Sequence, residues 1–307
     1  MEGRNMDKQL LQLNGIYPPI PTPFDGEGKV ASRQLTENLA HWNRFALRGY
    51  VVLGTNGEFV LLTEQEKLQL LETARRAIPS EKLMIAGTGC EGSNETIRLT
   101  RKAAEVGADA ALVINPSYYK TRMTPEALIH HFQMVADSSP IPIIIYNMPA
   151  CTGIDLAAEI IVQLAEHPNI IGLKDSAGNV VKLGQIRLLA GPGFQVMAGS
   201  ASFLLPALSV GAIGGILALG NIAPAQCLAI LQHFLEGDWE KAREVQLRII
   251  PANTAVTSRW GVAALKTAMD MLGLYGGPVR PPLLPLSNDV KLKLKTILLE
   301  AGILQAS

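Results

Sequence analysis

The 307-residue sequence has few cysteines and no net charge. Its three cysteines, Cys90, Cys151 and Cys227, lie far apart. Their number and spacing exclude a disulfide framework and a paired-cysteine metal site, and they fit a reducing cytoplasm. Lysine plus arginine equals aspartate plus glutamate, 27 each, so we expect no nucleic acid partner and no attraction to an anionic membrane. A small substrate with local charge suits this balance.

Long apolar runs and a targeting segment are also missing. The stretch 210–219 is too short and too rich in glycine to span a membrane. Residues 1–13 mix charges with Gln and Leu, which excludes a secretory signal, and they carry acids that a transit peptide avoids. We therefore expect a cytoplasmic protein. No His–Glu–His spacing at predicted strand ends indicates a divalent metal, and no cofactor is expected.

What the sequence does contain is a series of short, continuously apolar runs separated by helical stretches. Continuous apolarity is typical of parallel strands that are buried on both faces. Thr63 with Glu66 forms a capping box, and Thr124-Pro125 is typical of a helix start. The eight runs cover residues 16–20, 49–53, 83–86, 110–114, 142–146, 170–174, 194–198 and 213–218.

Strand and helix alternating about eight times predict a (β/α)8 TIM barrel, with a doubly wound sheet as the less favoured alternative. After the eighth run the pattern becomes helical throughout. We expect an N-terminal arm over residues 1–14, the barrel over 15–223, and a C-terminal helical extension over 224–307.

Lys174 ends the sixth run and should point into the mouth of the barrel, where active sites of this fold lie. Most other lysines, such as Lys67, Lys102 and Lys182, fall in polar helical faces where a solvated charge is expected. Burial favours the neutral amine, which can attack a carbonyl carbon. The alternative is a buried salt bridge with Asp175, and position alone does not decide between the two.

Two further strand ends carry polar groups. The turn at residues 54–57 can present successive backbone N–H groups to a carboxylate, although a plain connecting turn fits equally well. Tyr146 ends the run before that of Lys174 and is a candidate proton shuttle, or a core tyrosine with a satisfied hydroxyl.

Two motifs suggest other functions, a dinucleotide site and a metal site, and the sequence argues against both. Residues 87–92 match G-x-G-x-x-G, but Asp109 precedes its predicted strand, whereas a ribose-binding acid should follow one. His130 and His131 are adjacent on a predicted helix and so face different directions. We expect neither a dinucleotide site nor a metal site there.

Taken together, these strand ends resemble the dihydrodipicolinate synthase / N-acetylneuraminate lyase family from about residue 15 to at least residue 285. The resemblance implies a barrel with C-terminal helices, a Schiff base between Lys174 and a small 2-oxo acid, and a homotetramer built as a dimer of dimers. The motifs that carry it are Gly54-x-x-Gly57-Glu58, Tyr146-Asn147-x-Pro149-x-x-Thr152-Gly153 and Gly172-Leu173-Lys174-Asp175-Ser176.

The resemblance also implies roles for other residues. Tyr146 is the expected proton shuttle, and its relay partners are Thr55 and, from the neighbouring subunit, Tyr118. The substrate carboxylate is expected on the N–H groups of Thr55 and Asn56. The remaining expected substrate contacts are Ser176 and Gly199.

Within the family, Cys151 stands where synthases that use aspartate semialdehyde carry arginine. Residues 54–59, 87–91, 128–131, 174–176 and 275–278 are similar to 4-hydroxy-2-oxoglutarate aldolase, which is mitochondrial in animals. A mature animal form would therefore lie in the mitochondrial matrix, and a bacterial enzyme is preferred. The alternatives are 4-hydroxy-tetrahydrodipicolinate synthase, a 2-keto-3-deoxy sugar-acid aldolase or dehydratase, and, remotely, a non-catalytic protein that binds 2-oxo acids.

Overall fold

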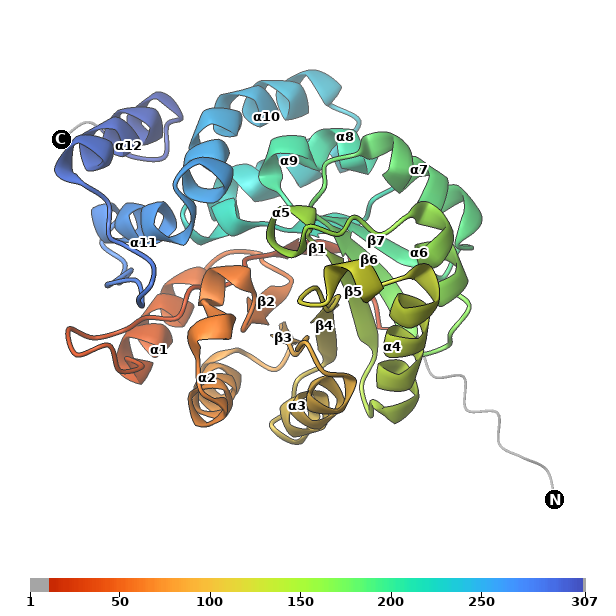
Figure 1. Ribbon diagram of the computed structural model, residues 1–307. Coiled ribbons are helices and arrows are strands. Elements are labelled where there is room, and N and C mark those ends of the chain that lie inside the picture. Colours follow the sequence, from red (N-terminus) through yellow and green to blue (C-terminus); the bar gives the residue numbers. More distant parts are fainter. Residues whose placement is uncertain (1–10, 306–307) are drawn as a thin grey trace.

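The computed structural model describes residues 11–305, which form a barrel of eight parallel strands surrounded by helices (Figure 1). Each predicted apolar run overlaps one strand. Hydrogen bonds from Ile20 N to Val51 O, 2.9 Å, and from Val51 N to Pro18 O, 3.0 Å, join the first strand to the second and close the barrel. The strands are β1 Gly15–Tyr17, β2 Gly49–Val52, β3 Leu83–Gly87, β4 Ala110–Ile114, β5 Ile143–Asn147, β6 Ile170–Asp175, β7 Gln195–Ala198 and β8 Gly214–Ile216.

Helices follow the strands and cover the outside of the barrel (Figure 1). The predicted capping box is present, since the Thr63 side chain accepts from Glu66 N and the Glu66 side chain accepts from Thr63 N. Thr124 caps the helix that begins at Pro125. These helices are α1 Ser32–Trp42, α2 Glu64–Ala77, α3 Ser93–Glu105, α4 Pro125–Ser138, the short α5 Pro149–Thr152, α6 Ala158–Leu164, α7 Val180–Leu189, α8 Leu204–Ser209 and α9 Pro224–Leu235.

The apolar core has two parts, as expected where strands are buried on both faces. The larger part lies between the strands and the helices. The smaller part fills the barrel interior and includes Tyr17, Ile144, Tyr146 and Met197. Leu13 belongs to it as well, and Gln195 accepts from Leu13 N at 2.8 Å. Of the expected N-terminal arm, only residues 11–14 fall within the described part of the chain.

The C-terminal helices lie at one side of the barrel (Figure 1). α9 packs against α8 and β1, so we propose to count it as the eighth barrel helix and to begin the extension at α10 rather than at residue 224. No helix within residues 11–305 is long and apolar enough to cross a membrane. The extension contains α10 Trp239–Thr254, a π-helical turn Ala255–Arg259, α11 Gly261–Met271 and α12 Asn288–Glu300.

Candidate active site

Lys174 and Tyr146 lie side by side in the mouth of the barrel. Tyr146 on β5 is the register partner of Lys174 on β6, which in turn pairs with Met197 on β7. Directly paired residues of parallel strands point to the same face, and Tyr146 and Met197 both belong to the interior cluster. The Lys174 amine lies 3.9 Å from the centroid of the Tyr146 ring, and the residue is only 5% exposed. The structure therefore places the lysine where the sequence predicted it.

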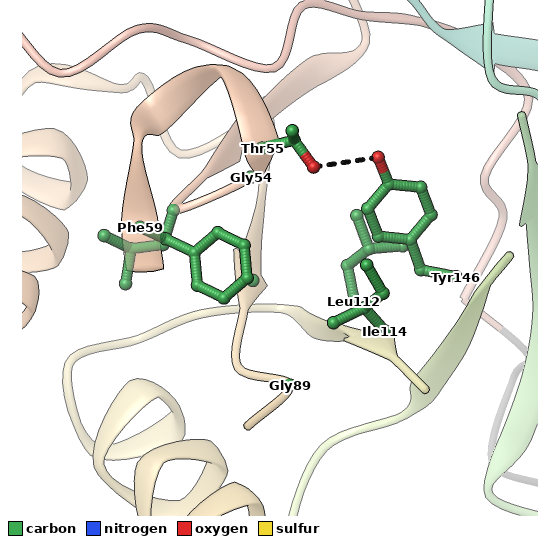
Figure 2. A pocket seen from close by; sticks show the side chains of 9 residues that line it. Gly54, Thr55, Phe59, Gly89, Leu112, Ile114 and Tyr146 are labelled. Carbon is green, nitrogen blue, oxygen red and sulfur yellow. Dashed lines mark hydrogen bonds between the residues drawn. The ribbon is translucent and has the colours of Figure 1, made fainter. Parts of the chain in front are cut away.

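Thr55 completes this group from the turn after β2. Residues Thr55–Gly57 form one turn of 3₁₀ helix, and Thr55 Oγ1 lies 3.1 Å from the Tyr146 hydroxyl. Figure 2 shows the two side chains pointing toward each other beside a small pocket. Asn56 is next in the turn and is partly exposed. The pocket is lined by Leu53, Gly54, Thr55, Phe59, Gly87, Gly89, Leu112, Ile114 and Tyr146.

The salt bridge considered for Lys174 is not formed. Asp175 instead accepts from Lys182, at 2.9 Å, and from the Asn147 side chain, at 2.7 Å. Within residues 11–305, no carboxylate lies within salt-bridge distance of Lys174. Its amine is therefore a buried nitrogen that no carboxylate of the described residues engages.

The expectation of a solvated charge at Lys182 is wrong. Its side chain is buried and lies between the carboxylates of Asp155 and Asp175, with 2.5 Å to the first of them. Asn147 donates to both of these carboxylates. The network connects the end of β6 with α7 and with the segment after α5. No helical periodicity marks Lys182 as buried, because it lies in the first turn of α7 directly after Val180 and Val181.

Ser176 and Gly199 lie in contact with each other at the ends of β6 and β7. The Ser176 hydroxyl oxygen is buried and has no hydrogen-bond partner among the described residues. Gly199 N donates to Asp175 O at 2.7 Å, and a Cβ on Gly199 would lie 2.1 Å from Ser176 Oγ. Glycine is therefore required at position 199 by the backbone of β6, since a Cβ would also lie 2.5 Å from Asp175 O.

Tyr118 is not brought into the pocket by its own chain. It is 78% exposed and packs edge-on against Tyr119, with ring centroids 5.2 Å apart. Glu91 fixes the loop by accepting from Ser117 N and Tyr118 N, each at 2.8 Å. A role for Tyr118 in a relay with Thr55 therefore depends on a neighbouring subunit.

Asp109 and His131, which the sequence offered for other sites, are bound within the fold, while Gly87 and Gly89 line the pocket described above. Asp109 precedes β4 and accepts from Met84 N at 2.8 Å. His131 is buried and its Nδ1 lies 2.9 Å from Ser93 Oγ. Burial, as the largest cause, lowers the pKa of His131 to about 4. No group of three or more potential metal ligands occurs within the described residues.

Known proteins are similar to this one over nearly the whole of the chain. Residues 12–301 match the Dihydrodipicolinate synthetase family. The chain belongs to this family. It is therefore an enzyme of the lyase type, and its (β/α)8 barrel with C-terminal helices is the architecture that the sequence predicted.

Individual relatives carry two kinds of name. A 4-hydroxy-tetrahydrodipicolinate synthase of Methanothrix thermoacetophila is 35% identical, covering 93% of this chain and 96% of the relative. A probable mitochondrial 4-hydroxy-2-oxoglutarate aldolase of Emericella nidulans is 37% identical, covering 90% and 91%. The synthase name is the more frequent of the two among the relatives compared.

Solved structures agree with this relationship. A prophage protein of the dihydrodipicolinic acid synthase family from E. coli K12, solved in complex with pyruvate, superposes with a TM-score of 0.90 at 31% identity, covering 96% of this chain and all of the other. A dihydrodipicolinate synthase of Bacillus anthracis gives a TM-score of 0.90 at 30% identity, covering 94% and 98%.

Proposed function

We propose that this enzyme forms a Schiff base between Lys174 and the 2-oxo carbon of its substrate, and that it cleaves 4-hydroxy-2-oxoglutarate to pyruvate and glyoxylate. One observation carries the Schiff base. The Lys174 amine is buried without a counter-ion in the described residues, and it contacts Tyr146, whose hydroxyl is bonded to Thr55. A nucleophile beside a group that moves protons is the arrangement that imine chemistry requires.

The reaction begins when the neutral Lys174 amine adds to the 2-oxo carbon and the resulting carbinolamine loses water. The protonated imine then accepts the electron pair of the C3–C4 bond. Tyr146 removes the proton of the 4-hydroxyl group, so that C4 leaves as the aldehyde carbon of glyoxylate. The enamine that remains takes a proton at C3, and water releases pyruvate and regenerates the amine. Thr55, 3.1 Å from the Tyr146 hydroxyl, carries the proton onward.

The substrate carboxylates need separate partners. The first N–H groups of a helical turn have no partner within the turn, so the N–H groups of Thr55 and Asn56 suit the 1-carboxylate. The unpaired Ser176 hydroxyl and the Asn56 side chain are the proposed contacts for the 4-hydroxyl or the distal carboxylate. Tyr118 of a neighbouring subunit would extend the relay beyond Thr55, in a homotetramer made of two dimers.

The presence of Cys151 at its position favours an aldehyde substrate other than aspartate semialdehyde. It lies on α5, which follows the strand of Tyr146. Partial desolvation is the largest cause that acts on its thiol, and it raises the pKa above the ordinary value. The thiol is therefore neutral at pH 7, whereas the synthases that the sequence resembles place an arginine at this position to bind a carboxylate.

The synthase reaction is the second candidate, and the names of the relatives favour it. The Methanothrix thermoacetophila relative carries the synthase name and covers almost the whole chain. In that reaction the same enamine on Lys174 would attack aspartate semialdehyde instead of being protonated. Both candidates pass through the same pyruvate enamine on Lys174. In the aldolase it forms when the C3–C4 bond breaks, and in the synthase it forms when the pyruvate imine loses a proton from C3.

Borohydride trapping tests the shared chemistry. Incubation with pyruvate and borohydride should add one reduced pyruvate unit to Lys174, as located by peptide mass spectrometry, and Lys174→Ala should abolish the addition. Lys82→Met is the matched control, since Lys82 is also buried but bonds only to the carbonyls of Asn43 and Phe45. An unmodified parent protein, or an adduct that survives in Lys174→Ala, refutes the Schiff base.

The aldehyde partner needs its own assay. Glyoxylate release from 4-hydroxy-2-oxoglutarate should exceed the rate with aspartate semialdehyde plus pyruvate, and also pyruvate release from neuraminate or from a 2-keto-3-deoxy sugar acid. A higher rate with aspartate semialdehyde would select the synthase.

A further inference from the structure

The turn that carries Thr55 and Asn56 is bracketed by two strained residues. Leu53 has φ 63° and Glu58 has φ 55°, and no other residue except glycine within 11–305 has a positive φ. The left-handed region costs free energy for a residue with a Cβ, and most of all for a bulky one. Such strain persists only where the surrounding structure holds it, and it concentrates at functional sites.

Glu58 is held by two groups from the C-terminal extension. Its Oε1 lies 2.5 Å from the amine of Lys266 on α11, and its Oε2 accepts from Arg280 N at 2.8 Å. Both side chains of the Glu58–Lys266 pair are only 1% exposed. Lys266 also donates to Pro278 O at 2.8 Å and lies 4.4 Å from the centroid of the Phe24 ring.

The turn has one more anchor, from the segment after β1. Thr22 Oγ1 donates to Gly57 O at 2.6 Å, and Thr22 is buried. The last two residues of the turn are thus fixed by neighbours: Thr22 holds Gly57, and Lys266 holds Glu58. Thr55 and Asn56 remain partly exposed toward the barrel mouth.

A buried ion pair is a poor means of gaining stability, because removing both charges from water offsets much of their attraction. Burial lowers the pKa of Lys266, with the Glu58 charge opposing it, which reflects this cost. Apolar side chains of similar volume would have filled the same space. The position of the pair therefore calls for another reason, and the strained turn directly attached to Glu58 provides one.

We infer that Glu58 and Lys266 are positioning residues that hold the turn of residues 53–58 in the conformation that receives the substrate carboxylate. The C-terminal extension is then part of the active site, although it contributes no catalytic residue. The inference rests on the proposed function, because it requires that the turn binds the 1-carboxylate of the substrate. It goes beyond that function by assigning a role to two buried charges that never touch the substrate.

The test compares pyruvate with acetone, which has the carbonyl group but no carboxylate. In Glu58→Gln, which keeps an oxygen acceptor but loses the charge, the pyruvate concentration for half-maximal borohydride trapping should rise by at least about tenfold, since misplacement by an ångström is enough for such losses. The trapping rate with acetone should change less than about threefold, because Lys174 itself is not moved. At saturating pyruvate the adduct still forms on Lys174.

Each single variant leaves one buried charge without its partner. Lys266→Met is therefore compared with the double variant Glu58→Gln/Lys266→Met, in which neither buried charge remains. The double variant should show the same selective loss for pyruvate while its thermal unfolding stays closer to that of the parent. Lys82→Met is the control for loss of a buried lysine elsewhere, and it should lower stability without raising the pyruvate requirement.

Two results would overturn the inference. One is a pyruvate requirement in the folded Glu58 and double variants within about twofold of the parent. The other is an equal loss for pyruvate and acetone, which would show that Lys174 was disturbed instead of the turn. The proposed function fails separately, through the absence of any trapped pyruvate in the parent protein.

Discussion

Replacing Tyr146 with phenylalanine removes a single oxygen atom from the proposed proton path. The residue is 4% exposed and belongs to the interior cluster, so the ring should keep its place and its contact with the Lys174 amine. The loss is confined to the hydrogen bond with Thr55 Oγ1, at 3.1 Å. Thr55 is partly exposed and can bond to water instead, so the free energy of unfolding should fall by only about 0.5–1.5 kcal/mol.

The effect on catalysis should be much larger than the effect on stability. A positioned acid–base group contributes about 10²–10⁴-fold to a rate. That range corresponds to about 3–5 kcal/mol in the activation free energy. We expect kcat for glyoxylate release from 4-hydroxy-2-oxoglutarate to fall by this factor, while borohydride trapping at saturating substrate still labels Lys174. Steady-state kinetics, trapping and urea unfolding on the same preparation measure the three quantities.

Tyr17→Phe is the matched control for this experiment. Tyr17 is a second interior tyrosine, and its phenol lies beside Arg48, which precedes β2, at the end of the barrel opposite to Lys174. This variant should keep kcat within about twofold of the parent, since most effects away from the site act through stability alone. The reasoning is refuted if Tyr146→Phe keeps more than a tenth of the parent kcat, or if Tyr17→Phe loses as much.

Two further predictions concern stability. Lys182→Met should lower the free energy of unfolding by about 3–5 kcal/mol, because the fully buried Asp175 then lacks a counter-ion. Urea unfolding measures this loss, and the exposed Lys295→Met is the control, expected within about 0.5 kcal/mol of the parent. Similar losses in the two variants would contradict the prediction. His131 has its pKa lowered from 6.5 to about 4 by burial, so its contribution is complete above pH 6.5 and is lost as the pH falls toward 4, a decline on the order of 3 kcal/mol at most. Unfolding measured across this range should show a shallower decline in His131→Gln, and an unchanged slope would assign the decline to other groups.

The strands were predictable because burial on both faces leaves a direct mark on the sequence. In the fourth strand the predicted run and the observed strand coincide, at residues 110–114, and elsewhere the ends differ by a few residues. The first run, residues 16–20, shows why. Pro18 and Pro19 have no N–H group to donate to a neighbouring strand, so the regular strand ends at Tyr17. Only the bridge of Pro19 with Val51 continues it.

The position of Lys174 followed from the same logic, but its surroundings did not. Strand order and register bring Tyr146 beside it, and both depend only on runs that the sequence displays. The partner of Asp175 depends on how α7 is rotated, and a helix of ten residues with apolar side chains on several faces does not fix that rotation. The sequence therefore predicts a solvated Lys182, whereas the structure buries it against two carboxylates.

Sequence patterns could not predict the pairing of Glu58 with Lys266, because 208 positions separate the two residues (266 minus 58). Nothing local marks Lys266, which lies in a helix with few other charges. The motif at residues 54–58, by contrast, is visible, and its glutamate has no obvious task if the turn alone binds a carboxylate. A buried acid next to a binding turn requires a buried base from elsewhere in the chain, because an unpaired carboxylate would be costly. Lys266 on α11, outside the eight strand–helix repeats, is the base that pairs with this acid.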